Sequence, residues 1–165
     1  MNTNLNLNNK SIANKNSLLK DIWRASRPLS LTLALYSTTL GIVIAHWEGK
    51  LLSGNLSYDL WLIFLVTIAG LAVQTATNFI NDYFECEIKY VSYRSQGEKR
   101  YQFLGQKRAA FDILIFMLGI ACFLITGIIG LYLTYLTTTR LLLIGVLGII
   151  GGYSYTGEPI VYKKR

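Results

Sequence analysis

The residues best suited to chemistry lie in the stretch 74–89, which reads QTATNFINDYFECEIK. Asn78, Asp82 and Glu85 are separated there by four and three residues, a spacing that places them on one face of an α-helix. An amide and two carboxylates supply the oxygen ligands that magnesium prefers, and water and phosphate oxygens complete its coordination shell. The spacing therefore predicts a magnesium–phosphate site.

The elements that must position these residues are membrane-spanning helices. Of the 165 residues, 52% are hydrophobic and only 15% are charged, whereas soluble domains carry about a quarter charged residues. The same fractions exclude a disordered chain, and two cysteines are too few for a disulfide-rich scaffold. We expect an all-α, polytopic transmembrane helix bundle.

Four stretches are long and apolar enough to cross a bilayer, which takes about 20 residues. They are residues 29–47, 60–80, 111–136 and 141–155. The asparagine-rich residues 1–22 predict a flexible polar tail leading into an interfacial helix around residues 20–25, and residues 23–165 are expected to form one transmembrane domain. Pro28 is expected at the start of the first spanning helix, where no intrahelical N–H is lost. Close helix packing is expected at the glycines of the fourth stretch, Gly145, Gly148, Gly151 and Gly152.

The basic residues predict the orientation of the bundle. Fourteen of the 16 lie before the first stretch, between the second and third, or after the fourth. Because basic loops stay in the cytosol, both chain ends and the candidate site are expected on the cytosolic face of the cell membrane, an N-in/C-in topology. This distribution explains the net charge of +7 without nucleic acid, whose binding would require a folded basic face with interleaved aromatic residues.

Two interpretations of the acidic stretch are open at this point. Ionisable residues at membrane depth are costly and normally face a cavity or a partner, which favours a site. The alternative is that Asp82 and Glu85 are ordinary interfacial carboxylates, solvated by the loop that follows them. Spacing alone does not decide between the two.

The motif NFINDYFE resembles the first aspartate-rich motif of the UbiA superfamily of intramembrane aromatic prenyltransferases, most of all the branch that prenylates 1,4-dihydroxy-2-naphthoate in menaquinone biosynthesis. Three further segments resemble the family in the same order: WRASRPLSLTLALYSTTLGI at 23–42, LGQKRAAFDI at 104–113 and GGYSYTGEPIVYKKR at 151–165. The resemblance implies Mg²⁺-dependent transfer of a polyprenyl group from polyprenyl diphosphate to an aromatic quinone precursor. It implies Asn78, Asp82 and Glu85 as metal ligands, with Asp82 and Glu85 as the catalytic residues.

The resemblance also implies residues that bind the substrates. Arg27 or Arg24, from the cytosolic end of the first helix, and Lys163 are expected to bind diphosphate, the alternative being a role as positive-inside anchors. Tyr155, with Tyr153, is expected to line the cavity, where aromatic faces stabilise an allylic cation. The alternative for these tyrosines is a place in the aromatic belt of the membrane interface.

The motif departs from the family pattern in two places. Glu85 stands where the family usually has aspartate, and no acidic residue occupies the further position that the family uses. Lys89 is present in that region, and we expect it to contact phosphate directly. The family's R-P-L-x-x-G loop is replaced by SYRSQGEKRYQFLG.

The resemblance covers only part of the family's fold, which has many more transmembrane helices and a second aspartate motif in its latter half. We therefore expect this chain to be the N-terminal half of a full-length or split enzyme, with a separate C-terminal half as a partner. One rival hypothesis is a non-catalytic, truncated membrane protein. A small transporter or channel is disfavoured, because its charges would lie within the spans rather than at their cytosolic ends.

Overall fold

The computed structural model describes residues 18–52, 54–89, 100–155 and 157–160, and for residues 85–89 it describes the backbone alone. Residues 18–25 form a short helix. The elements that follow are α2 (Pro28–Trp47), α3 (Leu56–Lys89), β1 (Arg100–Phe103), β2 (Gln106–Ala109), α4 (Ala110–Leu136) and α5 (Arg140–Ser154).

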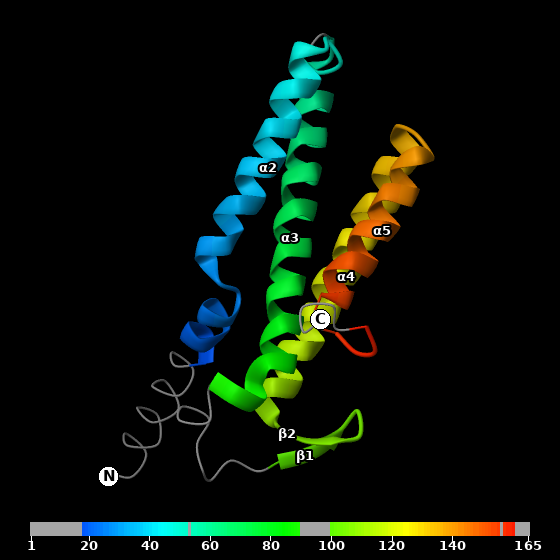
Figure 1. Ribbon diagram of the computed structural model, residues 1–165. Helices are drawn as coiled ribbons and strands as arrows, with labels where there is room; N and C mark the ends of the chain where they lie inside the picture. The colour runs from blue at the N-terminus through cyan, green and yellow to red at the C-terminus, as the bar shows by residue number, and fades with distance from the viewer. Residues whose placement is uncertain (1–17, 53, 90–99, 156, 161–165) are drawn as a thin grey trace, which may run out of the picture.

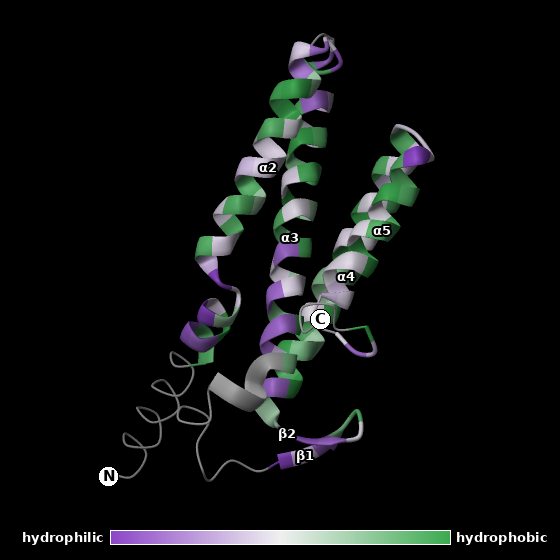
Figure 2. Ribbon diagram, in the orientation of Figure 1, coloured by the Kyte–Doolittle hydropathy of each residue, from purple (hydrophilic) through white to green (hydrophobic). Residues whose placement is uncertain are grey.

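The helices alternate in direction along the bundle (Figure 1). The start of α2, the end of α3, the start of α4 and the end of α5 therefore lie toward one end of the molecule. Figure 2 shows that the hydrophilic residues of α3 are concentrated in the part of this helix near that end of the molecule. The topology thus brings segments that are far apart in sequence to the end where the candidate site is expected.

The helix over residues 18–25 agrees with the helix expected around residues 20–25, and it begins inside the stretch 1–22 that was predicted as a flexible tail. Residues 1–17 lie outside the described residues. Pro28 stands in the first turn of α2, as predicted, and Arg27 before it has φ 51° and ψ 70°. Proline disfavours the right-handed helical conformation at the residue that precedes it, so the chain breaks between the two helices at Arg27.

Among the described residues, three helices are long and apolar enough to cross a membrane: Pro28–Trp47, Leu56–Phe84 within α3, and Ala110–Leu136. Three of the four predicted spans are thus confirmed. The fourth stretch, predicted at 141–155, forms α5, whose 15 residues reach about 22 Å at 1.5 Å per residue, less than the hydrocarbon core of about 30 Å, so its crossing stays a prediction. The predicted end of the second span at residue 80 is too early. Polar residues after that position do not stop the helix, which continues to Lys89.

A short antiparallel hairpin adds strands to a fold predicted to be all-α. Arg100 pairs with Ala109 and Phe103 with Gln106. The two residues of the turn, Leu104 and Gly105, have φ 47° and 78°, which is the pattern of a two-residue type I′ turn. The hairpin leads directly into α4 and fixes where that helix starts.

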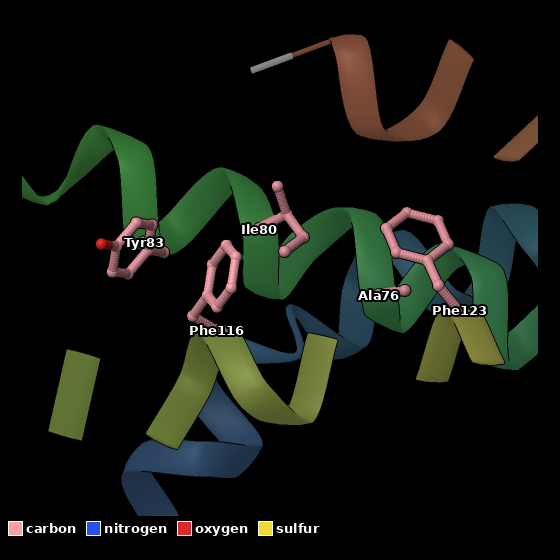
Figure 3. Packing of buried hydrophobic residues seen from close by; sticks show 5 residues of the cluster. All are labelled: Ala76, Ile80, Tyr83, Phe116 and Phe123. Carbon is pink, nitrogen blue, oxygen red and sulfur yellow. The ribbon is translucent and has the colours of Figure 1, made fainter. Parts of the chain in front are cut away.

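The core lies between α3 and the start of α4. Figure 3 shows Ala76, Ile80 and Tyr83 on one side of α3 facing Phe116 and Phe123 of α4. The Tyr83 and Phe116 ring centroids are 4.8 Å apart. In lipid, helices associate through close packing rather than through a hydrophobic driving force, so this interdigitated aromatic surface holds the bundle.

Glycines let the helices approach at three places. A β-carbon at Gly119 of α4 would lie 3.1 Å from Ile80, one at Gly152 of α5 would lie 2.9 Å from Thr77, and one at Gly70 of α3 would lie 2.5 Å from Thr38. The packing role predicted for the glycines of the fourth helix is thus confirmed for Gly152. At Gly145, Gly148 and Gly151 a β-carbon would meet no neighbouring group within 4 Å among the described residues.

Candidate functional site

A polar stripe runs along the last turns of α3. At 3.6 residues per turn, positions 74, 78, 81, 82 and 85 fall within an arc of about 100°. Asn78, near the middle of this arc, contacts the start of α2, and Thr77, beyond the edge at Asn81, lies against Gly152 of α5. The stripe therefore faces α2, with its Asn81 edge toward α5, whereas the core residues face α4.

Asn78 joins this stripe to the break between the first two helices. Its Nδ2 donates to the backbone oxygen of Ser26 at 2.7 Å and to Oγ of Ser30 at 2.6 Å. Its Oδ1 accepts from Nε2 of Gln74 at 3.4 Å. The side chain is buried, and both of these Nδ2 hydrogen bonds reach a segment about 50 residues earlier in the chain.

Asp82 lies one turn further along α3, next to Arg27. The Arg27 Nη2 and Asp82 Oδ1 are 3.9 Å apart, and the two side chains are 39% and 13% exposed. This distance brings the charges together without the geometry of a direct hydrogen bond. The structure thus places a predicted metal ligand beside a predicted diphosphate-binding cation, on two different helices.

Asn81 was not singled out as a ligand in the sequence, although it stands in the same motif. It is 3% exposed, and its Oδ1 has no hydrogen-bond partner among the described residues. A buried amide oxygen without a partner is costly unless a ligand or water satisfies it. Asn81 is therefore an acceptor available to the site, directly next to Asp82 in sequence.

Arg108 is a second feature that sequence reasoning missed. The hairpin carries this buried residue to Tyr83, whose ring centroid lies 4.8 Å from the Arg108 Cζ. Asp112, buried in the first turn of α4, and Glu158 are close enough to Tyr83 to interact with it electrostatically. The sequence did not indicate this contact, because Arg108 lies in a segment that was predicted as a loop and Tyr83 is 25 positions earlier in the chain.

The other predicted site residues are only partly described. Glu85 and Lys89 belong to α3, but their side chains lie outside the described residues, as does all of Lys163. Tyr155 caps the C-terminal end of α5 through its backbone N–H, which donates to the Gly151 oxygen at 3.1 Å. Tyr153 packs against the core. The structure therefore brings together Arg27, Asn78 and Asp82 and places Tyr155 at the same end of the bundle.

The donors in this stripe match the chemistry of magnesium. The Asp82 carboxylate and the Asn81 amide oxygen are hard oxygen donors of the kind that Mg²⁺ takes in small number. Within the part of the chain that the structure describes, no three histidine, cysteine, aspartate or glutamate residues form a cluster.

Comparisons with known proteins give two distant relatives. The chain is 28% identical over 149 residues to the 1,4-dihydroxy-2-naphthoate octaprenyltransferase of Bacillus subtilis, and the match covers 88% of this chain and 44% of that protein. It is 24% identical over 149 residues to the UbiA prenyltransferase domain-containing protein 1 of Dictyostelium discoideum, covering 89% of this chain and 43% of that protein. No family model and no solved structure matches. The resemblance to UbiA prenyltransferases is thereby confirmed, and the chain spans less than half the length of the curated relatives it matches.

Proposed function

We propose that this distant homologue of UbiA prenyltransferases forms the diphosphate-binding half of an intramembrane enzyme, full-length or split, that transfers a polyprenyl group to an aromatic acceptor. The observation that carries the proposal is the approach of Arg27 to Asp82 on a polar face of α3, at one end of a bundle of apolar helices. An apolar tail can lie along such helices while its diphosphate head reaches the charged end. We infer 1,4-dihydroxy-2-naphthoate as the acceptor from the Bacillus subtilis relative, whose name specifies it.

In the proposed reaction the allylic C–O bond of the polyprenyl diphosphate breaks and its electron pair leaves with diphosphate. The aromatic acceptor then supplies the electron pair of the new C–C bond, and the ring regains aromaticity by losing a proton, or a carboxylate as CO₂, from the prenylated carbon. Asp82 and Glu85 would hold Mg²⁺, which would supply electrostatic stabilisation of the leaving diphosphate. Arg27, Lys89 and Lys163 add positive charge on the same side.

The residues of this chain also orient the substrate. Arg27 is held close to Asp82, so the guanidinium and a Mg²⁺ ion held by the carboxylate would meet the same phosphate group. Tyr155, at the end of α5, is proposed to face the prenyl carbons, where an aromatic ring stabilises positive charge. Because the chain spans less than half of its relatives, we propose that the rest of the cavity comes from a further segment or a separate C-terminal half.

The test is Mg²⁺-dependent binding of inorganic pyrophosphate by the purified 165-residue chain, followed by turnover with a labelled polyprenyl diphosphate and two acceptors, 1,4-dihydroxy-2-naphthoate and 4-hydroxybenzoate. We expect the chain alone to bind pyrophosphate only with Mg²⁺ and to turn over almost nothing, because catalysis requires both substrates to be held together. Absence of Mg²⁺-dependent binding would contradict the proposed site and favour a non-catalytic membrane protein. Rapid turnover by the chain alone would contradict the half-enzyme hypothesis.

The proposed orientation places the site on the cytosolic face. Reporter fusions after Arg100 and Arg165 should report the cytosol, and fusions after Lys50 and Thr138 the opposite side. A cytosolic signal from the Thr138 fusion would show that α4 and α5 do not cross as proposed.

A further inference from the structure

The Asn78 amide has a different role in the structure from the one its position in the motif predicts. We propose that Asn78 is a positioning residue, which holds Arg27 against Asp82, and that it does not ligate the metal. This inference rests on the proposed function, in that it assigns Arg27 to the diphosphate. It changes which residues of the motif are expected to bind the ion and which bind other parts of the chain.

The orientation of the Asn78 amide follows from the chemistry of its partners. The Ser26 backbone oxygen can only accept a hydrogen bond, so the Asn78 atom 2.7 Å away must be the NH₂ group. The Ser30 hydroxyl donates its own hydrogen to the Arg27 oxygen at 2.9 Å, so it too must accept from Asn78. Two independent acceptors therefore fix Nδ2 on the side of α2.

This orientation directs Oδ1, the atom of the Asn78 amide that could bind a metal ion, away from the carboxylates. Oδ1 of Asn78 is engaged by Gln74, which lies on the preceding turn of α3, whereas Asp82 lies on the following turn. The atom on the opposite side of the amide, Nδ2, carries hydrogens and offers no lone pair to a cation. The buried Asn81 oxygen has no hydrogen-bond partner among the described residues, so it is the amide oxygen of the motif that a ligand or water would satisfy.

The two acceptors of Asn78 flank Arg27 on both sides. Ser26 precedes Arg27 and Ser30 bonds to the Arg27 backbone oxygen, so one amide ties down both ends of the chain break. Arg27 itself has the left-handed backbone conformation, with φ 51°, which a non-glycine residue keeps only where its surroundings enforce it. The bonds from Asn78 supply that enforcement and leave the guanidinium 3.9 Å from Asp82.

The two hydrogen bonds from Asn78 to Ser26 and Ser30 form a clamp on the start of α2. The weak packing of α2 explains why hydrogen bonds between helices are concentrated at this point. None of the residues of α2 is buried, so apolar packing alone fixes the start of this helix weakly. Hydrogen bonds between helices are directional and specify one position along α3, which packing of an exposed helix does not. The distance between Arg27 and the metal site is therefore set by Asn78.

The experiment compares Asn78→Asp and Ser30→Ala with Ser37→Ala. Asn78→Asp keeps an oxygen ligand but removes both N–H donors, and Ser30→Ala removes one acceptor of Asn78 without changing any residue of the acidic motif. Ser37→Ala is the matched control, because among the described residues the Ser37 hydroxyl bonds within its own helix α2, to the Leu33 oxygen at 2.9 Å. Two readouts are taken on the full chain in detergent micelles.

The first readout is the electron–electron distance between spin labels at Leu29→Cys and Met117→Cys, two positions that are 84% and 54% exposed, in a background with Cys86→Ser and Cys122→Ala. We expect Asn78→Asp and Ser30→Ala to shift or broaden this distance distribution and Ser37→Ala to leave it unchanged. An unchanged distribution in both test variants would overturn the clamp, whatever the chain binds.

The second readout is the affinity for inorganic pyrophosphate, measured with and without Mg²⁺. We expect Ser30→Ala to weaken Mg²⁺-dependent pyrophosphate binding about tenfold, as for the loss of one charge-assisted contact, without changing the Mg²⁺ concentration that binding requires. Full affinity in Ser30→Ala together with normal or tighter Mg²⁺ binding in Asn78→Asp would show that Asn78 is a ligand and overturn the proposal. If wild type binds no pyrophosphate, the proposed function fails, and the label distances still decide whether Asn78 positions Arg27.

Discussion

The two long faces of α3 are built on different principles. Toward α4, the helix presents Ile80 and Tyr83, which are almost completely buried against Phe116 and its aromatic neighbours. Toward α2, it presents the amide of Asn78 and the carboxylate of Asp82, and α2 itself contributes no buried residue. The first face determines whether the bundle forms, and the second determines where a few charged groups lie relative to one another.

The difference predicts that the two faces respond differently to substitution. A dense aromatic surface loses stability when an atom is removed or added, because its neighbours relax only in part. A face held by a few directed bonds can change its chemistry while the bundle remains folded. The following predictions test this separation, from the largest expected effect to the smallest.

Replacing Asp82 by Asn should have the largest effect, and it should appear in function alone. Asparagine keeps the size of the side chain and removes the charge that attracts Mg²⁺ and pairs with Arg27. We expect Mg²⁺-dependent prenylation in an active assembly to fall by about a hundredfold to a thousandfold, the cost of one lost electrostatic contact to a transition state. Initial rates across a Mg²⁺ titration measure it.

The matched control is Asp59→Asn, the same substitution at the opposite end of α3. The Asp59 carboxylate accepts from the Leu52 backbone N–H at 2.9 Å, so this variant should lose some thermal stability and keep its Mg²⁺-dependent activity. Near-normal activity of Asp82→Asn with an unchanged Mg²⁺ dependence would show that Asp82 is an ordinary interfacial carboxylate.

Phe116→Ala tests the opposite face and should act on stability. The Phe116 ring contacts those of Tyr83, Phe84 and Phe103, so its removal leaves a cavity between α3, α4 and the hairpin. We expect the free energy of unfolding to fall by about 3 kcal/mol. Leu124→Ala on the same helix, where the side chain is 63% exposed, is the control and should cost far less. Equal losses in denaturant unfolding of the two variants would contradict the assignment of the core.

The two faces also differ in how well the sequence predicts them. Three long helices were predictable, because a continuous apolar stretch of about 20 residues indicates a membrane-spanning helix. The break at Arg27 was predictable from Pro28. The bounds of α5 were predictable as well, since the expected stretch 141–155 differs by one residue at each end from the helix Arg140–Ser154.

The polar face was predictable as a set of residues and not as an arrangement. The spacing of Asn78 and Asp82 indicates a shared helix face, and the structure places both beside the start of α2. The bonds of Asn78 to Ser26 and Ser30 could not be predicted, since they depend on how two helices pack about 50 residues apart in sequence. For the same reason the position of Arg108 over Tyr83 could not be predicted, since it depends on the hairpin.

Gly119→Val measures how closely α4 approaches α3. A β-carbon there would lie 3.1–3.2 Å from side-chain atoms of Ile80 and Phe79, so the two helices must separate or the side chains must leave their preferred rotamers. Overpacking of this kind costs about 1–3 kcal/mol. Gly127→Val on the same helix, where nothing lies within 4 Å among the described residues, is the control. Thermal unfolding of both variants in micelles should separate them, and similar melting temperatures would contradict the close approach at Gly119.

Gly70→Ala tests the approach of α2 to α3, and its effect should be the smallest. Alanine raises helix propensity by up to about 1 kcal/mol relative to glycine, but at Gly70 its β-carbon would lie 2.5 Å from Cγ2 of Thr38, a branched side chain with little freedom. We expect the gain in helix propensity and the cost of the clash nearly to cancel in Gly70→Ala, whereas Gly41→Ala, which meets nothing within 4 Å among the described residues, should stabilise the chain.

Thr38→Ser removes Cγ2 and keeps the hydroxyl that bonds to the Ala34 oxygen within α2. The double variant Gly70→Ala with Thr38→Ser should therefore recover the stabilisation seen at Gly41, and the coupling between the two substitutions in denaturant unfolding measures the contact directly. Strict additivity of the two substitutions would mean that α2 does not touch α3 at this level, and that the bonds of Asn78 alone hold it.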